Sequence, residues 1–309
     1  MTQYKSILVA VDPNHDAQPA IERAAYLAQQ SQGNLVLSLS VFDFSYEMTS
    51  MLSSDDRENL RASLVNQRKA WLEELAQPVR EKGQKVDTHV TWHNRPYESI
   101  IEQALRIEAD LIVKSTHHHD KLKSVIFTPT DWHLLRKSPI PVLLVKDHDW
   151  PEAGKILVAV NVAAEDDDHQ ALNNKVVTQA LKLANAVKAE VHLVNGYPGT
   201  PVNIAIELPD FDAHAYNESL KSHHEKRLAE MAKHHGINEQ NCHVLEGLPE
   251  DVIPDLAEQL DAELVVIGTI GRTGLSAALI GNTAEHVIDQ LQCDLLALKP
   301  DGFESPITL

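Results

Sequence analysis

The sequence predicts an α/β fold made of two tandem, doubly wound domains, each with a five-stranded parallel sheet, related by internal duplication. Three observations support this prediction. A set of apolar runs occurs twice in the same order, which indicates a repeat of domain size. Strand-like apolar runs alternate with helical patterns, as they do in βαβ units. The length of 309 residues suits about two domains.

The duplication is visible in three pairs of matching runs. The paired runs share an apolar pattern and a place in the order: Ile7–Asp12 with Ile156–Asn161, Ala109–Val113 with Ala262–Val266, and Val142–Lys146 with Leu295–Lys299. The polar stretch Asp147–Glu152 has the character of a linker between the copies. We therefore expect one domain over residues 1–149 and a second over residues 150–309, each of ordinary single-domain size.

Each copy contains the same series of expected elements. An opening strand is followed by an amphipathic helix, a second strand, a long polar helix, a third strand, and a helix that begins at a proline. The expected bounds are 35–41 and 191–195 for the second strand, 57–82 and 216–235 for the long helix, and 86–92 and 242–245 for the third strand. Pro96 and Pro249 stand where a first helical turn accepts proline. A fourth strand, a loop with a helix, and a fifth strand complete each copy. The strand runs are continuously apolar, which favours parallel strands covered by helices on both faces.

The overall charge limits the expected partners. The chain has 27 Lys and Arg against 45 Asp and Glu, a net charge of −18, which disfavours nucleic acid and anionic membrane surfaces. No apolar stretch approaches the length of about 18 residues that a membrane span needs. The two cysteines, Cys242 and Cys293, match no zinc or disulfide pattern, which is typical of a reducing compartment. We expect a cytoplasmic protein with no nucleic-acid partner and no membrane partner.

The second copy carries a glycine pattern at the end of its fourth strand. Gly268, Gly271 and Gly281 are spaced as G-x2-G-x9-G, and a helix is expected to open near Thr283. Glycine allows close approach of a ligand to the backbone, and a helix N-terminus favours an anion. Arg272 would add a charge-assisted contact to a phosphate. The alternative is that these glycines only form turns, because spaced glycines alone are weak support for a phosphate site.

The residues around this pattern resemble a known family. The string GTIGRTGLSAALIGNTAEHVI, preceded by ELVVI and followed closely by CDLLALK, is similar to the universal stress protein family. The openings YKSILVAVD and GKILVAVN resemble the first strand of that family. The resemblance covers both copies, and it implies a tandem member of the family. It also implies that the pattern G-x2-G-x9-G followed by Ser or Thr lines the phosphates of ATP.

Carried over by position, the resemblance implies the following residues for ATP binding: Asn161, Ile267, Gly268, Gly271, Arg272, Gly281, Asn282 and Thr283. The glycines would line the phosphates, Asn282 and Thr283 would offer donors, and Ile267 would face the base or sugar. Two positions depart from the family pattern. Asn282 stands where Ser or Thr is expected, and Asn161 stands where the family usually has Asp near the nucleoside. Asparagine can still form hydrogen bonds to phosphate or ribose.

The first copy has lost this pattern. Ser115, His118 and Thr128 stand opposite the three glycines, and Pro129, which has no N–H to donate, stands opposite Asn282. We therefore predict that the first copy does not bind ATP in the manner of the family.

Histidine is frequent, with 17 residues, and suggests a second cofactor hypothesis. His117, His118 and His119 precede Asp120, and imidazole with carboxylate is a ligand set that zinc prefers. The alternative, which we favour, is that the histidines are solvated side chains on the surface. No H-x3-H pair on a helix supports the zinc hypothesis.

The sequence thus predicts a cytoplasmic stress-response protein that binds ATP or a similar nucleotide in its C-terminal domain and is at most a slow ATPase. No catalytic residue is identified. The alternative is a non-nucleotide interaction or scaffold protein, or a binder of another small molecule or of zinc. Family members usually pair through the last strand, so the resemblance implies that Val142–Lys146 pairs with Leu295–Lys299 within one chain. A higher oligomer stays open.

Overall fold

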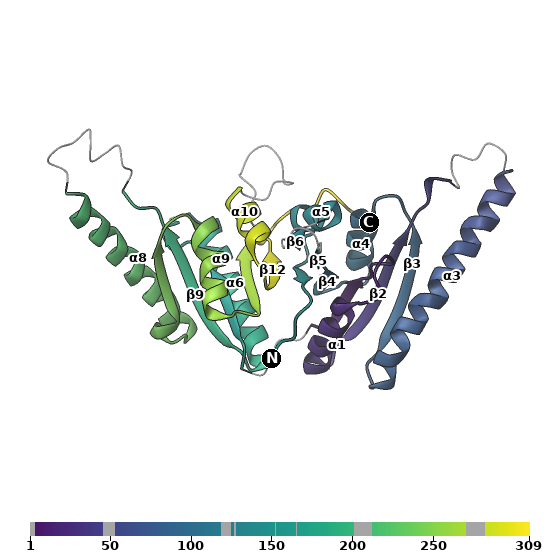
Figure 1. The fold of residues 1–309 in the computed structure, drawn as a ribbon, viewed down its shortest axis with the longest axis horizontal. Helices are drawn as coiled ribbons and strands as arrows, with labels where there is room; N and C mark the ends of the chain where they lie inside the picture. The colour runs from purple at the N-terminus through teal and green to yellow at the C-terminus, as the bar shows by residue number, and fades with distance from the viewer. Residues whose placement is uncertain are drawn as a thin grey trace. The chain divides into compact units, whose positions relative to one another are not determined.

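A computed structural model describes residues 4–45, 53–118, 125–126, 128–151, 153–164, 166–200, 212–269 and 282–309 (Figure 1). The chain forms two units. Unit 1 contains Met1–His118, Ile126–Asp147 and the C-terminal residues Glu304–Leu309. Unit 2 contains His148–Phe303 together with residues 119–125.

The sheet of unit 1 has five parallel strands, in the order β7-β4-β1-β2-β3. Their bounds are Ser6–Ala10 for β1, Asn34–Val41 for β2, Val86–Trp92 for β3, Leu111–Ser115 for β4 and Val142–Val145 for β7. β1 lies between β2 and β4, so the strand order reverses there. In a doubly wound sheet this reversal opens a crevice at the carboxyl ends of the strands, where ligands bind.

The helices of unit 1 pack on this sheet. They are α1 (Pro19–Ser31), α3 (Ser54–Glu81), α4 (Pro96–Arg106) and α5 (Pro129–Lys137). α1 contacts β1 and β4, α4 contacts β2, and α3 contacts β3 at the sheet edge. Two short strands, β5 (His117–His118) and β6 (Val125–Ile126), form a separate ribbon after β4, where the sequence suggests a loop.

Unit 2 repeats this arrangement with the strand order β10-β9-β8-β11-β12, again all parallel. The strands are β8 (Lys155–Ala159), β9 (Glu190–Tyr197), β10 (Cys242–Glu246), β11 (Leu264–Gly268) and β12 (Asp294–Leu298). The helices are α6 (Asp167–Val187), α8 (Ala213–His235), α9 (Pro249–Leu260) and α10 (Asn282–Gln290), with a 3-10 turn at Glu239–Asn241. The predicted fold class, two doubly wound α/β domains related by duplication, is confirmed.

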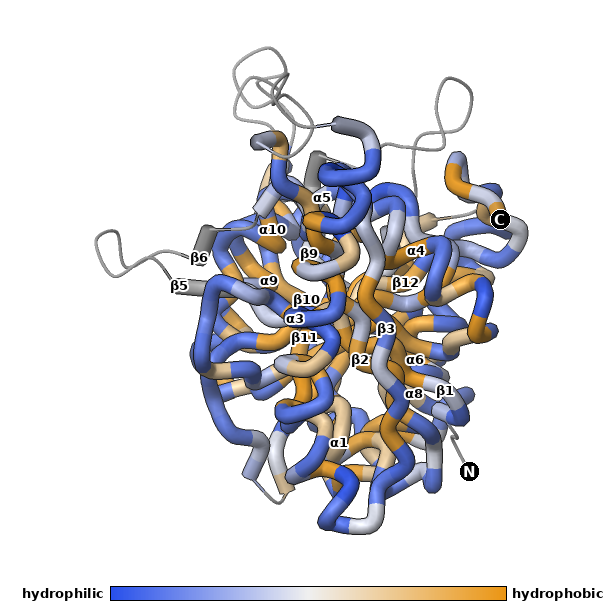
Figure 2. The backbone as a smooth tube through the Cα atoms, turned by 90° about the vertical axis from the view of Figure 1, so that its right-hand side faces the viewer, coloured by the Kyte–Doolittle hydropathy of each residue, from blue (hydrophilic) through white to orange (hydrophobic). Residues whose placement is uncertain are grey.

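Most of the apolar runs that revealed the repeat form the core. The strand residues of β1, β4, β7, β11 and β12 are almost entirely buried, and Figure 2 shows hydrophobic colour concentrated along the strands. An acidic residue before the fourth strand of each unit joins it to the first strand. Asp110 Oδ2 accepts hydrogen bonds from the amides of Lys5 (2.6 Å) and Ser6 (3.0 Å), and Glu263 accepts one from the Lys155 amide. The repeated acidic position therefore has a structural role.

The structure also extends some predicted elements. In the sequence, the apolar residues at helical spacing begin at Val176. α6 instead begins at Asp167, because the Asp166 side chain accepts a hydrogen bond from the His169 amide (2.9 Å) and caps the helix. The added turns contain Leu172 and Asn173, which both border a cavity of unit 2.

Two stacked histidines on adjacent strands of unit 2 are expected to make its stability depend on pH. His192 Nδ1 and His243 Nε2 lie 3.0 Å apart, and burial lowers the pKa of both rings. A histidine whose pKa is lower in the folded chain than in the unfolded chain stabilises the fold above about pH 6.5, and this stabilisation is lost as the pH falls. We expect the free energy of unfolding to decline from about pH 7.5 to about pH 5. In His243→Gln, urea titrations should show a shallower decline.

The control for this prediction is His214→Gln, because the His214 side chain is 83% exposed. It should keep the pH dependence of the wild type. An unchanged slope in His243→Gln would contradict the prediction.

Candidate functional site

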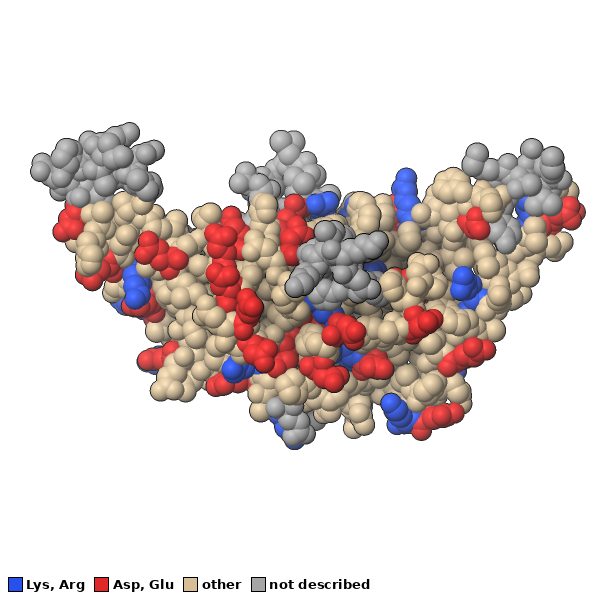
Figure 3. Space-filling view, viewed as in Figure 1, with Lys and Arg blue, Asp and Glu red and all other residues tan. Residues whose placement is uncertain are grey.

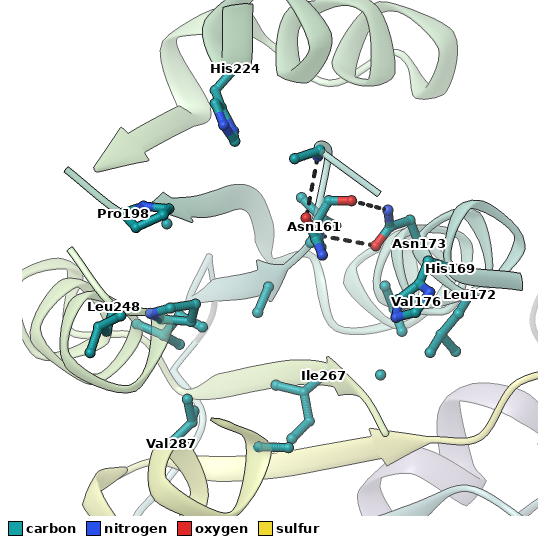
Figure 4. A pocket seen from close by; sticks show the side chains of 18 of the residues that line it. Asn161, His169, Leu172, Asn173, Val176, Pro198, His224, Leu248, Ile267 and Val287 are labelled. Atoms are coloured by element: carbon teal, nitrogen blue, oxygen red, sulfur yellow. Dashed lines mark hydrogen bonds between the residues drawn. The ribbon is translucent and has the colours of Figure 1, made fainter. Parts of the chain in front are cut away.

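Unit 2 contains a cavity of about 840 Å³ at the carboxyl ends of β8 and β11, where its strand order reverses (Figure 4). The lining comes from the loop after β8, α6, the end of β9, α8, the start of α9, the end of β11, and α10. Its volume lies within the range of small-molecule sites, and the position is the one where doubly wound sheets bind ligands. The cavity is therefore the candidate binding site.

Asn161 lies on one wall of the cavity, two residues beyond the end of β8. Its backbone is held by Asn173 of α6: the Asn161 amide donates to Asn173 Oδ1 (3.1 Å), and Asn173 Nδ2 donates to the Asn161 carbonyl (2.8 Å). Asn161 Oδ1 accepts from the Ala163 amide (3.2 Å). Within the described residues, Asn161 Nδ2 has no hydrogen-bond partner, so it is available as a donor to a ligand.

Ile267 and Gly268 border the cavity at the end of β11. A Cβ on Gly268 would stand 2.5 Å from Leu172 Cδ2, so the absence of a side chain lets α6 pack directly against this backbone. Gly268 is therefore needed for packing as well as for access.

α10 contributes the first helical turn to the same cavity. Ala284, the third residue of α10, and Val287 both line it. The amides of a first helical turn have no partner within the helix, and the helix dipole favours an anion beside them. This end of the cavity is thus suited to a phosphate group.

The cavity is also bordered by apolar residues and by a buried histidine. Pro198, Leu220 and Leu248 border it together with His224, which is 5% exposed. Figure 4 shows His224 on the side of the cavity opposite Ile267 and Val287. We did not predict this residue from sequence, although its spacing of four from Leu220 and from Leu228 places it on the buried stripe of α8.

The structure brings three of the predicted site residues together at the cavity, namely Asn161, Ile267 and Gly268. Gly271, Arg272 and Gly281 lie outside the described residues. The backbones of Asn282 and Thr283 form the start of α10, and their side chains are outside the described part of the chain.

Unit 1 has a buried ion pair at the positions that border the cavity in unit 2. Lys114 and Asp131 stand opposite Ile267 and Ala284 in the repeat. Lys114 Nζ lies 2.8 Å from Asp131 Oδ1, and the two side chains are only 9% and 0% exposed. This pair stands at the positions of two residues that line the cavity in unit 2.

The same carboxylate also caps α5, the counterpart of α10. Asp131 Oδ2 accepts from the Thr128 amide (2.8 Å), and the Asp131 amide donates to Thr128 Oγ1 (3.3 Å). Nearby, Ser115 Oγ accepts from the Ala20 amide of α1 (3.1 Å). The helix terminus that would meet a phosphate is therefore already occupied by an anionic side chain of the protein.

The histidines are less uniformly solvated than the sequence suggests. His192 and His224 are buried, which differs from the expectation of surface side chains. Across the described part of the chain, no group of three or more His, Cys, Asp or Glu is placed to hold a metal ion. The side chains of His117 and His118, and the whole of His119, lie outside that part.

The surface view agrees with the acidic composition. Figure 3 shows more acidic than basic side chains on the face in view, as expected for a net charge of −18. Among the described helices, none is both long enough and apolar enough to cross a membrane.

Comparisons with known proteins agree with the repeat. The model of the universal stress protein family matches residues 3–146 and again residues 153–299. The chain is 52% identical over 310 aligned positions to universal stress protein E of Escherichia coli K12, covering 100% of this chain and 98% of that protein. It is 41% identical to a universal stress protein E homolog of Haemophilus influenzae, covering 96% and 98% of the two chains.

Solved structures share the architecture. A universal stress protein structure from Pseudomonas aeruginosa UCBPP-PA14 is 33% identical, with a TM-score of 0.76 over 97% of this chain and 95% of that one. A universal stress protein from Archaeoglobus fulgidus, only 17% identical, shares the fold with a TM-score of 0.66 over 96% and 99% of the two chains. The two family matches and the full-length identity show that the chain belongs to the universal stress protein family, as a tandem member with two such domains.

Proposed function

We propose that the protein is a cytoplasmic stress-response protein that binds ATP or a similar nucleotide in unit 2. The observation that carries this proposal is the cavity at the strand reversal of unit 2, bordered by Asn161, Gly268 and the first turn of α10. It lies in the copy that keeps the spacing G-x2-G-x9-G. In this proposal Gly271, Arg272, Gly281, Asn282 and Thr283 hold the phosphates, and Asn161 donates to the nucleoside.

We further propose that unit 1 does not bind the nucleotide in this way. The ion pair of Lys114 with Asp131 supports this, because a carboxylate beside the first turn of α5 repels a phosphate. The asymmetry suits a protein with about one nucleotide site per chain, in which the N-terminal domain has another role.

The polar part of the described cavity wall includes amides and histidines. Asn161, His169, Asn173 and His224 are among its polar residues, and none of the described lining residues is Asp or Glu. A carboxylate that could act as general base on an attacking water is therefore missing from the described wall. We propose that the signal is the bound state itself, with hydrolysis slow if it occurs.

Calorimetric titration with ATP tests the proposal. We expect saturable binding with about one site per chain, and loss of binding in Gly271→Val with Gly281→Val, because a branched side chain blocks close approach to the phosphates. Gly274→Ala is the matched control, since Gly274 belongs to the same stretch but not to the glycine spacing. It should bind as the wild type does.

If the folded wild type binds no ATP, the nucleotide proposal fails. The scaffold hypothesis would then be preferred, and the replacement of the family's Asp by Asn161 and of its Ser or Thr by Asn282 would favour it.

A further inference from the structure

We propose that His224 selects the ligand of unit 2 by presenting a fixed Nε2–H donor to an uncharged acceptor atom of the base. This inference rests on the proposed nucleotide binding and adds the residue that discriminates between bases. Its basis is a chain of hydrogen bonds that allows only one tautomer of the neutral imidazole, the one with its proton on Nε2.

The chain begins at a backbone amide next to the cavity. The Val162 amide donates to Asn195 Oδ1 (3.0 Å), which fixes the orientation of the Asn195 carboxamide. Asn195 Nδ2 consequently faces His224 Nδ1 at 2.8 Å and also donates to the Gly196 carbonyl (3.2 Å). Asn195 is 1% exposed, so water does not compete for these bonds. Because Nδ2 can only donate, Nδ1 of His224 must accept.

The imidazole is held neutral and in place. Burial lowers the pKa of His224 below its usual value, and the neighbouring His223 lowers the pKa further. A neutral ring that accepts at Nδ1 carries its proton on Nε2. The ring also stacks on Tyr197, with centroids 5.4 Å apart and planes 30° apart. Asn195 is therefore a positioning residue, and His224 Nε2 is a donor with no hydrogen-bond partner among the described residues.

The location of His224 identifies the part of the ligand that it meets. Its side chain points from α8 toward the cavity, on the side opposite Ile267 and Val287 (Figure 4). A nucleotide with its phosphates at the first turn of α10 would extend its base toward this side. Among the cavity residues that the structure describes, Pro198, Leu220 and Leu248 are apolar, so a base that covers His224 without offering an acceptor would leave the donor unsatisfied. A ring nitrogen of adenine meets this requirement.

Deaza analogues of ATP test the contact, because each replaces one ring nitrogen by C–H. We expect one of 1-deaza-, 3-deaza- and 7-deaza-ATP to bind the wild type about three- to tenfold more weakly than ATP. The same analogue should bind His224→Leu as well as ATP does. His223→Leu is the control, since His223 is the adjacent exposed histidine of α8. It should keep the discrimination of the wild type.

The proton position is measured without a ligand. In protein labelled with 15N-histidine, the ring shifts of His224 should report Nε2–H, and in Asn195→Asp they should report a proton on Nδ1. An Nδ1–H signal in the wild type would overturn the proposal. ATP binding that is equal for all three analogues, or unchanged analogue discrimination in His224→Leu, would also overturn it. Absence of any nucleotide binding, with the Nε2–H signal present, would instead refute the proposed function and with it the assignment of a base.

Discussion

Asp131→Ala is expected to lower the free energy of unfolding of unit 1 by about 3–5 kcal/mol, because it leaves a buried ammonium without its partner. Lys114 Nζ has Asp131 Oδ1 at 2.8 Å, and the lysine side chain is 9% exposed. Its other described partner is the Ser115 carbonyl at 3.0 Å, a neutral acceptor. Urea denaturation followed by circular dichroism measures the change.

The controls separate the buried charge from the helix cap. Ser53 and Asp56 form the same capping box at the start of α3, where both residues are exposed, so Asp56→Ala should cost only about 1 kcal/mol. The double variant Lys114→Ile with Asp131→Ala copies the pair found in unit 2 and should recover most of the loss, because no unpaired charge is left. Equal losses in Asp131→Ala and Asp56→Ala would contradict the expectation.

The ion pair shows how far the sequence could predict the site. The missing glycines of the first copy predicted a lost phosphate loop from local residues alone. The ion pair of Lys114 with Asp131 joins β4 to α5, and only the tertiary packing brings these two residues together. One signal was present, because Lys114 interrupts the apolar run of the fourth strand, where an unpaired charge would be costly.

The fold was more predictable than the site because its determinants are local. Continuous apolar runs specify buried parallel strands, and Pro96 and Pro249 begin α4 and α9 as predicted. The early start of α6 was missed, since it depends on a cap at Asp166 rather than on apolar spacing. His224 was missed for a different reason: a pair of adjacent histidines suggests a solvated surface, whereas only one of the two faces the sheet.

The same comparison between the units predicts how to remove nucleotide binding from unit 2. Ala284→Asp places a carboxylate at the third residue of α10, as Asp131 stands in α5, and should weaken ATP binding at least about tenfold by repelling the phosphates. Adenosine has no phosphate, so its affinity should change much less. Ala215→Asp is the matched control, because Ala215 is the third residue of α8, is exposed, and is not among the cavity residues.

Adding Ile267→Lys to Ala284→Asp would transfer the complete ion pair into unit 2. The pair is neutral overall, so it should repel phosphate less than the single carboxylate of Ala284→Asp does. Its longer side chains should, however, occupy the part of the cavity that Ile267 and Ala284 border. We therefore expect loss of adenosine as well as ATP, measured by calorimetry with circular dichroism as the check on folding. A double variant that still binds adenosine would mean that the cavity is not where the nucleoside lies. Loss of both ligands would show that this ion pair alone is enough to exclude the nucleotide from the cavity of unit 2.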